Sequence, residues 1–356
     1  MPARTIVPRR GDVQPAEDYG FFGPGSVTWK VWSYPTSLTV GFQRAVVVEE
    51  LNPALVAAVE HAHGIYDRPR SRYDRTVRYF AQVAFGDARG TTRAADVLVK
   101  MHAMAVGIEP YSGEPYDAND PASQLWILLT GWHSVLYAYE KYGPGKLSAS
   151  EESRYWDECA VAARLQTCDP AEVPRTREGV RAYFERTRLG LAGSELARKA
   201  MSHLLRAEVM LPPMPRALRP LARLVSVALR AATLATMPRW MREMGGLHQA
   251  QLVDTLIVPV MRAAFALVHL NRRAELMALS VLSPSTVPVV APVLLGVPPQ
   301  KAETLTPERA RERFGYSPPC LAHAELRKRR RDKALAGAAR GDEGIREHQP
   351  VHGPIA

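Results

Sequence analysis

A polar cluster on one helix and a histidine on the next are the residues in this sequence best suited to chemistry. Arg72, Arg75 and Thr76 open an amphipathic helix, and His102 follows on the apolar side of the helix after it. Arginine supplies permanent positive charge and threonine a hydroxyl, while a neutral imidazole is a common metal ligand. The combination predicts one axial ligand for a metal or haem, with a cationic, hydroxyl-bearing helix beside it.

Helical periodicity places His102 on an apolar face. It shares one side of a 3.6-residue helix with Leu98, Met101 and Ala105, so we expect the imidazole to point inward. Such a histidine has two interpretations. It is either a core residue satisfied by a carbonyl, or the axial ligand of a haem, whose face needs an apolar wall. Lys100 lies off this face and is expected to reach a haem propionate.

The helix that carries the cluster places its polar groups on one face. Arg72, Arg75 and Thr76 occupy positions i, i+3 and i+4 of one face. Tyr79 extends that face by one turn, and Phe80 flanks it, so both are candidates for an apolar wall around a cofactor or substrate. Two guanidiniums and a hydroxyl beside aromatic rings can stabilise an anion or negative charge that develops on oxygen. The alternative is a solvated basic face.

The sequence offers few further candidates for a metal ligand or for the wall of a binding site. His133, on a strongly apolar segment, is the rival axial ligand, and Trp126 is a third candidate for the apolar wall. A di-iron carboxylate bundle needs two Glu-x-x-His motifs, whereas we find one, at residues 60–63. No GxSxG, GxGxxG, Walker A or HExxH motif is present, so hydrolase, dinucleotide and nucleotide functions lose their main support.

The elements that must position these residues are mostly helices. Residues 1–50 are rich in proline and glycine and are expected to form an irregular N-terminal arm. Residues 51–280 follow as a compact helical domain, residues 281–326 as a proline-rich C-terminal wrap, and residues 327–356 as a basic, disordered tail. Asp120 with Pro121, and a capping box from Ser148 to Glu151, mark two helix starts. The predicted fold class is all-α. The expected helices span residues 55–63, 71–85, 92–106, 120–142, 148–165, 176–188, 194–210, 218–236, 238–244, 249–275 and 307–314.

Composition is that of a soluble globular protein. The 356 residues are 46% hydrophobic and 23% charged, which suffices to bury a large core. Cys159, Cys168 and Cys320 show neither metal-ligand spacing nor a disulfide framework, which favours a reducing compartment. We recognise no export signal and no uninterrupted apolar run of transmembrane length, so a cytoplasmic location is expected.

The formal net charge of +10 is concentrated near the C-terminus, in the basic run of residues 327–333. Such a run can make a weak contact with an anionic membrane surface. The alternative is a solvated terminus without a partner. Because no aromatic residues interleave with the run, specific nucleic-acid binding is not expected. These observations leave the oligomeric state open.

Taken together, the motifs resemble the catalytic-domain family of rubber oxygenases (latex-clearing proteins) and fungal MpaB-type oxygenases. The resemblance covers roughly residues 20 to 275 and depends on the order and spacing of several short motifs. The motifs are Gly23-Pro24-Gly25-Ser26 with Trp29, Arg72-x-x-Arg75-Thr76, His102 with Val106-Gly107, Tyr116-x-Ala118-x-Asp120-Pro121, Trp126, Val173-Pro174-x-Thr176 and Met237-Pro238-Arg239-Trp240-Met241-Arg242.

The resemblance implies an all-α fold that holds one b-type haem, with His102 as the proximal ligand. It places Arg72, Arg75 and Thr76 on the distal side, where latex-clearing proteins carry an Arg-x-x-Lys-Thr set. Family members of known chemistry cleave carbon–carbon double bonds of isoprenoid chains with dioxygen. The implied function is a haem b-dependent oxygenase with a hydrophobic, isoprenoid or lipid-like substrate. Two alternatives remain: a non-catalytic haem carrier or gas sensor on the same fold, and a helical protein without haem that acts through its basic tail.

The sequence departs from the family pattern in three respects. Arg75 replaces the distal lysine, and a guanidinium is a poor metal ligand, so a lysine-capped resting state is not expected. Trp126 is followed by Ile127-Leu128 instead of Val-His, and its histidine is displaced to His133. The lack of an export signal favours an intracellular substrate over rubber.

Overall fold

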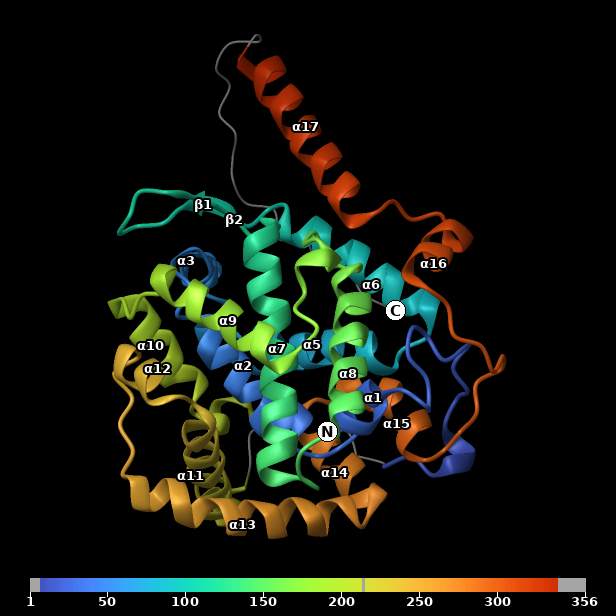
Figure 1. The fold of residues 1–356 in the computed structure, drawn as a ribbon, viewed down its shortest axis with the longest axis vertical. Helices are drawn as coiled ribbons and strands as arrows, with labels where there is room; N and C mark the ends of the chain where they lie inside the picture. Colours follow the sequence, from blue (N-terminus) through green and yellow to red (C-terminus); the bar gives the residue numbers. More distant parts are fainter. Residues whose placement is uncertain (1–6, 213–214, 339–356) are drawn as a thin grey trace.

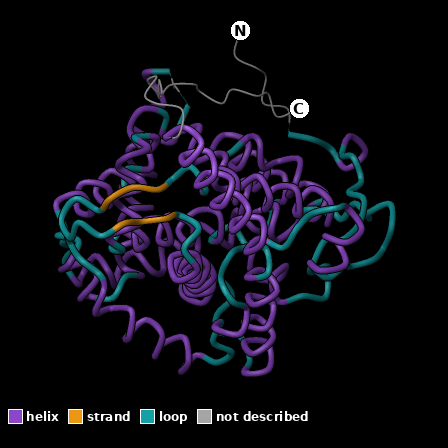
Figure 2. Tube along the Cα trace, turned by 90° about the horizontal axis from the view of Figure 1, so that it is seen from above, coloured by secondary structure: helices purple, strands orange, loops and turns teal. Residues whose placement is uncertain are grey.

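Helices make up most of residues 7–212 and 215–338, which the computed structural model describes (Figure 1). One antiparallel hairpin, β1 (Val106–Ile108) and β2 (Pro115–Asp117), is the only sheet in these residues, and Figure 2 shows it in orange. The all-α prediction is confirmed. The helices are α1 (Val27–Trp32), α2 (Phe42–Glu49), α3 (Pro53–Ala62), α4 (Gly64–Asp67), α5 (Pro69–Phe85), α6 (Ala88–His102), α7 (Pro121–Tyr142), α8 (Ala149–Ala163), α9 (Arg177–Thr187), α10 (Glu195–Leu204), α11 (Arg219–Thr236), α12 (Arg239–Met244), α13 (Gln251–His269), α14 (Arg272–Leu282), α15 (Val287–Leu294), α16 (Pro307–Phe314) and α17 (Pro319–Ala338).

Helix starts follow the capping residues that the sequence shows. The Asp120 side chain caps α7, with Pro121 at its first position, and Ser148 and Glu151 form the reciprocal capping box of α8. Both predicted starts are confirmed. The single helix expected over residues 249–275 is instead two, because the Asn271 side chain accepts hydrogen bonds from the first backbone N–H groups of α14.

Helix α7 forms the centre of the core. Its residues Leu128, Leu129 and Trp132 are fully buried, and it contacts α1, α2, α8, α11 and α13. A π-helical turn, Ser37–Gly41, also packs against it. A Cβ at Gly41 would lie 3.0 Å from the Cα of Val135, so the close approach of the two segments requires glycine.

Residues 27–49, which the composition had placed in an irregular arm, form helices α1 and α2. These helices belong to the core, where Val31, Val47 and Val48 have no exposed surface. Even Arg44 and Glu49 of α2 are buried. A helix buried on nearly every side has no solvent face, so its polar residues do not reveal the amphipathic period from which a helix is recognised.

The C-terminal wrap is held along the N-terminal segment. Backbone hydrogen bonds join residues 16–20 to residues 300–305, among them Gln300 N–H to the Ala16 carbonyl at 2.8 Å. Helix α17 follows. Its first turns are anchored, because the Cys320 thiol donates to the Thr167 carbonyl at 3.1 Å and His323 Nε2 donates to Asp117 Oδ2 at 3.2 Å.

Residues 327–338 are helical, where the composition had predicted disorder, and residues 339–356 lie outside the described residues. The side chains of residues 327–332 are exposed, and the contacts that anchor α17 all come from residues before 327.

Deleting residues 327–356 should therefore remove only the helical circular dichroism of residues 327–338 and leave the melting temperature within about 2 °C of the full chain. Deleting residues 319–356 removes both anchoring contacts and should lower the melting temperature, by about 2–4 °C for each kcal/mol lost. Thermal melts of the two truncations test this. An equal loss in both would show that the exposed half of α17 contributes to stability.

Helix α13 is the one described helix that is long and apolar enough to cross a membrane, judged by length and composition alone. In the structure it lies against α7, α11 and α14. It runs along the end of the molecule opposite α17 (Figure 1).

Candidate functional site

A cavity of about 400 Å³ lies between α2, α3, α5, α6 and the start of α7. Its size is typical of pockets that bind a cofactor or small molecule, and most of its wall is apolar. Six of the residues singled out from the sequence line it together: Arg72, Arg75, Thr76, Tyr79, Phe80 and His102.

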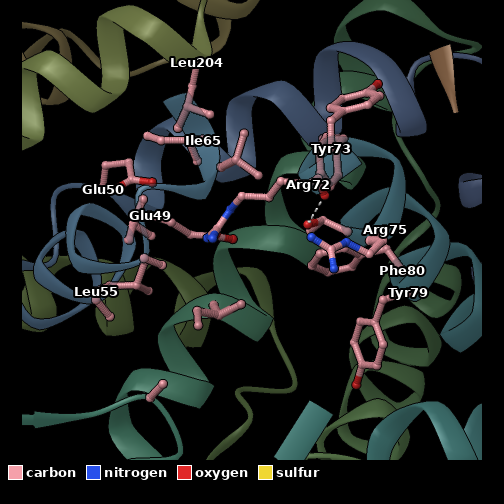
Figure 3. A pocket seen from close by; sticks show the side chains of 18 of the residues that line it. Glu49, Glu50, Leu55, Ile65, Arg72, Tyr73, Arg75, Tyr79, Phe80 and Leu204 are labelled. Carbon is pink, nitrogen blue, oxygen red and sulfur yellow. Dashed lines mark hydrogen bonds between the residues drawn. The ribbon is translucent and has the colours of Figure 1, made fainter. Parts of the chain in front are cut away.

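Helix α5 presents its polar row to the cavity (Figure 3). The Thr76 hydroxyl donates to the Arg72 carbonyl at 2.8 Å, so its proton is held by the helix and its lone pairs remain available. Arg75 is exposed, and its Nε donates to the Ser71 carbonyl at 3.3 Å. The row therefore presents one largely buried cation, Arg72, and one exposed cation, Arg75.

The Arg72 side chain extends toward the side of the pocket where Glu49 and Glu50 lie (Figure 3). Within the described part of the chain, its guanidinium forms no hydrogen bond and no ion pair. Burial lowers the pKa of this group, which Glu50 partly opposes, but arginine stays protonated. Arg72 is thus a fixed positive charge whose donors are free for a ligand.

His102 is the last residue of α6 and lines the cavity with Leu98 and Ala105. The Gln124 amide nitrogen, which can only donate, lies 3.2 Å from its Nδ1, so Nδ1 accepts and the ring proton is on Nε2, which has no hydrogen-bond partner among the described residues. Burial and the charge of Arg72 lower the pKa of His102 to about 4. The imidazole is therefore neutral near pH 7, which is the form that binds metals.

Part of the helical expectation around His102 is corrected. Helix α6 ends at His102 instead of continuing to residue 106, because Val106 begins strand β1. Met101, expected on the inward face, is 47% exposed. The 3.6-residue pattern therefore placed Leu98 and Ala105 correctly and Met101 wrongly.

Three predicted residues do not line the cavity: Lys100, Trp126 and His133. Lys100 is exposed and forms an ion pair with Asp96, with Nζ 2.6 Å from Oδ2. Trp126 is buried behind the wall, where its indole N–H donates to the Glu49 carbonyl at 3.3 Å. The position of Lys100, outside the cavity, therefore does not support the expected contact with a haem propionate.

His133, the rival ligand, is buried apart from the cavity. Its Nδ1 lies 3.3 Å from Arg44 Nη1, and its ring packs on Phe184. Burial, with the charges of Arg44 and Arg177, holds the pKa of His133 well below its usual range. His133 is therefore a neutral core histidine.

A pair of buried carboxyl groups was missed by sequence reasoning. Glu49 and Glu50 end α2 and line the cavity. Burial raises the pKa of Glu49 to about 7, although a hydrogen bond from Thr130 acts the other way. Burial likewise raises the pKa of Glu50 to about 8, against the opposing charge of Arg72. A sequence signal exists, because two adjacent glutamates follow the apolar run of residues 45–48 directly.

Glu50 carries a testable pH effect. Its pKa rises from 4.5 in an ordinary environment to about 8 in the fold, so between these values the folded protein binds a proton that the unfolded chain has lost. The free energy of unfolding should therefore fall as the pH rises from 4.5 to 8. Glu50→Gln removes this dependence and should stabilise the protein at pH 8, by roughly 2–4 kcal/mol, while matching wild type near pH 4.5.

Glu60→Gln is the matched control, measured by urea denaturation over the same pH range. Burial raises the pKa of Glu60, but the hydrogen bond and positive charge of Lys199 act the other way, and the net pKa is lowered. Glu60→Gln should therefore lose stability at neutral pH. Equal pH slopes for wild type and Glu50→Gln would contradict the buried-carboxyl interpretation.

No group of three or more histidine, cysteine, aspartate or glutamate side chains able to hold a bare metal ion occurs in residues 7–212 and 215–338. An axial ligand to haem needs only one protein side chain, because the porphyrin supplies the other four nitrogens. A neutral imidazole set in an apolar wall fits that requirement in the tautomer that carries its proton on Nδ1, which needs the Gln124 amide to present its oxygen to Nδ1.

A largely apolar pocket that is enclosed by helices and carries a few polar groups defines the class of protein: a helical protein that binds a cofactor or a small hydrophobic molecule. Comparison with protein families is more specific. The family model described as "ER-bound oxygenase mpaB/B'/Rubber oxygenase, catalytic domain" matches residues 29–270, and the chain belongs to this family of oxygenases. Comparison with curated proteins and with solved structures gave no match.

Proposed function

We propose that the protein is a haem b-dependent oxygenase that acts on a hydrophobic, isoprenoid or lipid-like substrate with dioxygen. The observation that carries the proposal is the neutral imidazole of His102, which lines an apolar pocket together with Arg72. Membership of an oxygenase family supports the reaction class. The haem requirement rests on the chemistry of His102 and on the family resemblance.

His102 would hold the haem iron through Nε2 with its proton on Nδ1, and the Gln124 amide, turned so that its oxygen accepts from Nδ1–H, would fix the ring orientation. When bound, the haem supplies an iron centre at which dioxygen is activated. Arg72 contributes a positive charge that stabilises negative charge developing on oxygen in the transition state. Thr76 offers a hydroxyl whose donation requires it to leave the Arg72 carbonyl.

The apolar wall defines the substrate class. Leu55, Val59 and Ile65 line one part of the pocket, and Tyr79 and Phe80 line another. Such a wall binds hydrocarbon and excludes water from the reacting groups. An alkene of isoprenoid or lipid type fits this surface, and oxidative cleavage of its double bond is the reaction that the family resemblance implies.

The state of the cysteines supports a reducing compartment such as the cytoplasm. Cys159, Cys168 and Cys320 are all free thiols. Secreted proteins of this size commonly pair their cysteines, whereas cytoplasmic proteins keep them reduced.

Two measurements on purified wild-type protein test the proposal. The absorption spectrum should show a Soret band with about one b-type haem per chain. The haem-loaded protein should then consume oxygen when supplied with a polyisoprenoid or an unsaturated lipid. A colourless protein that gains no Soret band with added haem would refute haem dependence. Haem binding without oxygen consumption would identify a carrier or gas sensor instead.

A further inference from the structure

Helix α13 leaves a continuous apolar stripe uncovered. Its outward residues recur every three or four positions, as on one side of a helix. The large ones are between 58% and 83% exposed. Figure 1 shows α13 along the edge of the molecule, with its outer side free of other elements. The stripe consists of Leu252, Leu256, Val260, Leu267 and Leu270.

The two neighbours of α13 widen this stripe into a face. Helix α11 packs against α13 and exposes Leu221, Leu224 and Val227, while α14 exposes Met277. We call the surface formed by these residues and the α13 stripe the α13 face. Large exposed apolar residues that gather on neighbouring helices are uncommon on monomeric soluble proteins, and where they occur they mark an interaction site.

The charges around the α13 face are positive. Helix α11 contains arginines and no acidic residue, and Arg219 and Arg223 are exposed without an ion pair among the described residues. The one acidic residue of α13, Asp254, is neutralised by Arg242, with Nη1 2.8 Å from Oδ2. On α14, Arg273 is likewise exposed.

The remaining charges follow the same pattern. Glu275 is the acidic residue of α14, and it pairs with Arg272 at 3.0 Å. Arg216 precedes α11 and Arg262 lies on α13, and both are exposed. The face therefore has an apolar centre and a cationic rim with few free acidic groups.

An apolar centre with a cationic rim indicates which kind of partner can bind this face. A second copy of the chain would bring the same cationic rim against itself in a two-fold interface, which like charges oppose. An anionic lipid surface offers hydrocarbon for the leucines and phosphates or carboxylates for the arginines. The inner side of α13 packs on the core through Met261 and Phe265, so the helix is suited to lie in the membrane interface.

We propose that the α13 face docks the protein peripherally on an anionic lipid bilayer. The leucine stripe inserts at the boundary of headgroups and acyl chains, and the arginine rim contacts anionic headgroups. The proposal stands on the exposed surface alone and is independent of the haem chemistry. It is also distinct from the basic run of residues 327–333, since α17 projects from the opposite end of the molecule (Figure 1).

Co-sedimentation with lipid vesicles tests the proposal. The full chain should bind vesicles of phosphatidylcholine mixed with phosphatidylserine and bind phosphatidylcholine alone far more weakly, and high salt should weaken the binding. The Leu256→Glu/Leu267→Glu variant should lose at least about tenfold in affinity, because it places charges in the apolar stripe. Both positions are exposed, so its circular dichroism and melting temperature should match wild type.

Three further proteins make the test specific. Leu189→Glu is the matched control, because Leu189 is 93% exposed but lies outside the α13 face, and it should bind as wild type. Arg219→Gln/Arg223→Gln should weaken binding to anionic vesicles and reduce its salt dependence. The chain without residues 327–356 should bind as the full chain does.

Four outcomes would overturn the proposal: no binding of the full chain to anionic vesicles, normal binding by Leu256→Glu/Leu267→Glu, equal loss in the Leu189→Glu control, or loss of binding on removal of residues 327–356. The last would assign membrane contact to the basic tail. A dimer in size-exclusion chromatography that Leu256→Glu/Leu267→Glu converts to a monomer, without vesicle binding, would assign the face to self-association.

Discussion

His102→Ala should yield a protein that folds normally but retains less than about one-tenth of the haem, because it removes the side chain that we propose as the ligand of the haem iron. The side chain is at the end of α6 and faces a cavity, so its removal disturbs few packing contacts. Far-ultraviolet circular dichroism should therefore be unchanged. Haem content per chain, measured by the pyridine haemochrome assay on protein expressed with added haem precursor, checks the expectation.

His133→Ala is the matched comparison and should behave in the opposite way. His133 packs beside Arg44 and Phe184, outside the cavity, so its loss creates a void and removes one partner of Arg44, which keeps the Ser134 hydroxyl and the Thr236 carbonyl. We expect lower thermal stability with normal haem content. Loss of haem in His133→Ala and its retention in His102→Ala would move the ligand to His133. Normal haem content in both variants would show that neither histidine is the ligand.

Arg72→Leu should lower kcat/KM while the protein keeps its haem and fold. A hydrogen bond to a charged group is worth roughly 1.5–3 kcal/mol, which corresponds to about 10- to 150-fold in rate if the bond forms only in the transition state. Arg72 forms no ion pair in the described residues, so its removal breaks no salt bridge that holds the fold. Steady-state oxygen consumption by the haem-loaded variant measures the effect, with haem content and melting temperature alongside.

Two other substitutions on α5 are the comparisons for the effect of Arg72→Leu on kcat/KM. Arg78→Leu removes a guanidinium from the exposed side of α5 and should leave kcat/KM unchanged. Thr76→Val keeps the β-branched shape, and its effect should be smaller than that of Arg72→Leu, because the hydroxyl proton is already held by the Arg72 carbonyl. Equal turnover in wild type and Arg72→Leu would mean that the row on α5 only lines the pocket.

Local signals sufficed to predict the helix that carries the polar row and the pocket side to which it points. Arg72, Thr76 and Tyr79 line the cavity as the i, i+4, i+7 spacing predicted, and the caps at Asp120 and Ser148 were correct. These features depend on residues within one or two turns of each other. Because the interactions are this local, the features can be predicted from the sequence.

Features that depend on residues far apart in the chain could not be predicted in this way. The raised pKa values of Glu49 and Glu50 arise from burial, because α2 packs against α7, α10 and α11, and this packing cannot be inferred from the spacing of the two residues. Trp126 was placed on the pocket wall because aromatic residues favour such walls, but its indole donates to the Glu49 carbonyl and its ring packs on Phe184 instead. Lys100 was expected at a propionate, although Asp96, one turn earlier, is a closer partner.

One of the three cysteine thiols, at the anchored start of α17, differs from the other two in its accessibility. Burial raises the pKa of Cys159 well above its usual range and that of Cys168 to about 12, and only the thiolate form reacts with electrophiles. Cys320 is the exposed thiol, and it sits where α17 contacts Thr167. A fluorophore attached there would take the place of the thiol proton that Thr167 accepts, and it would therefore both loosen and report on the junction between α17 and Asp117, a residue of the pocket wall.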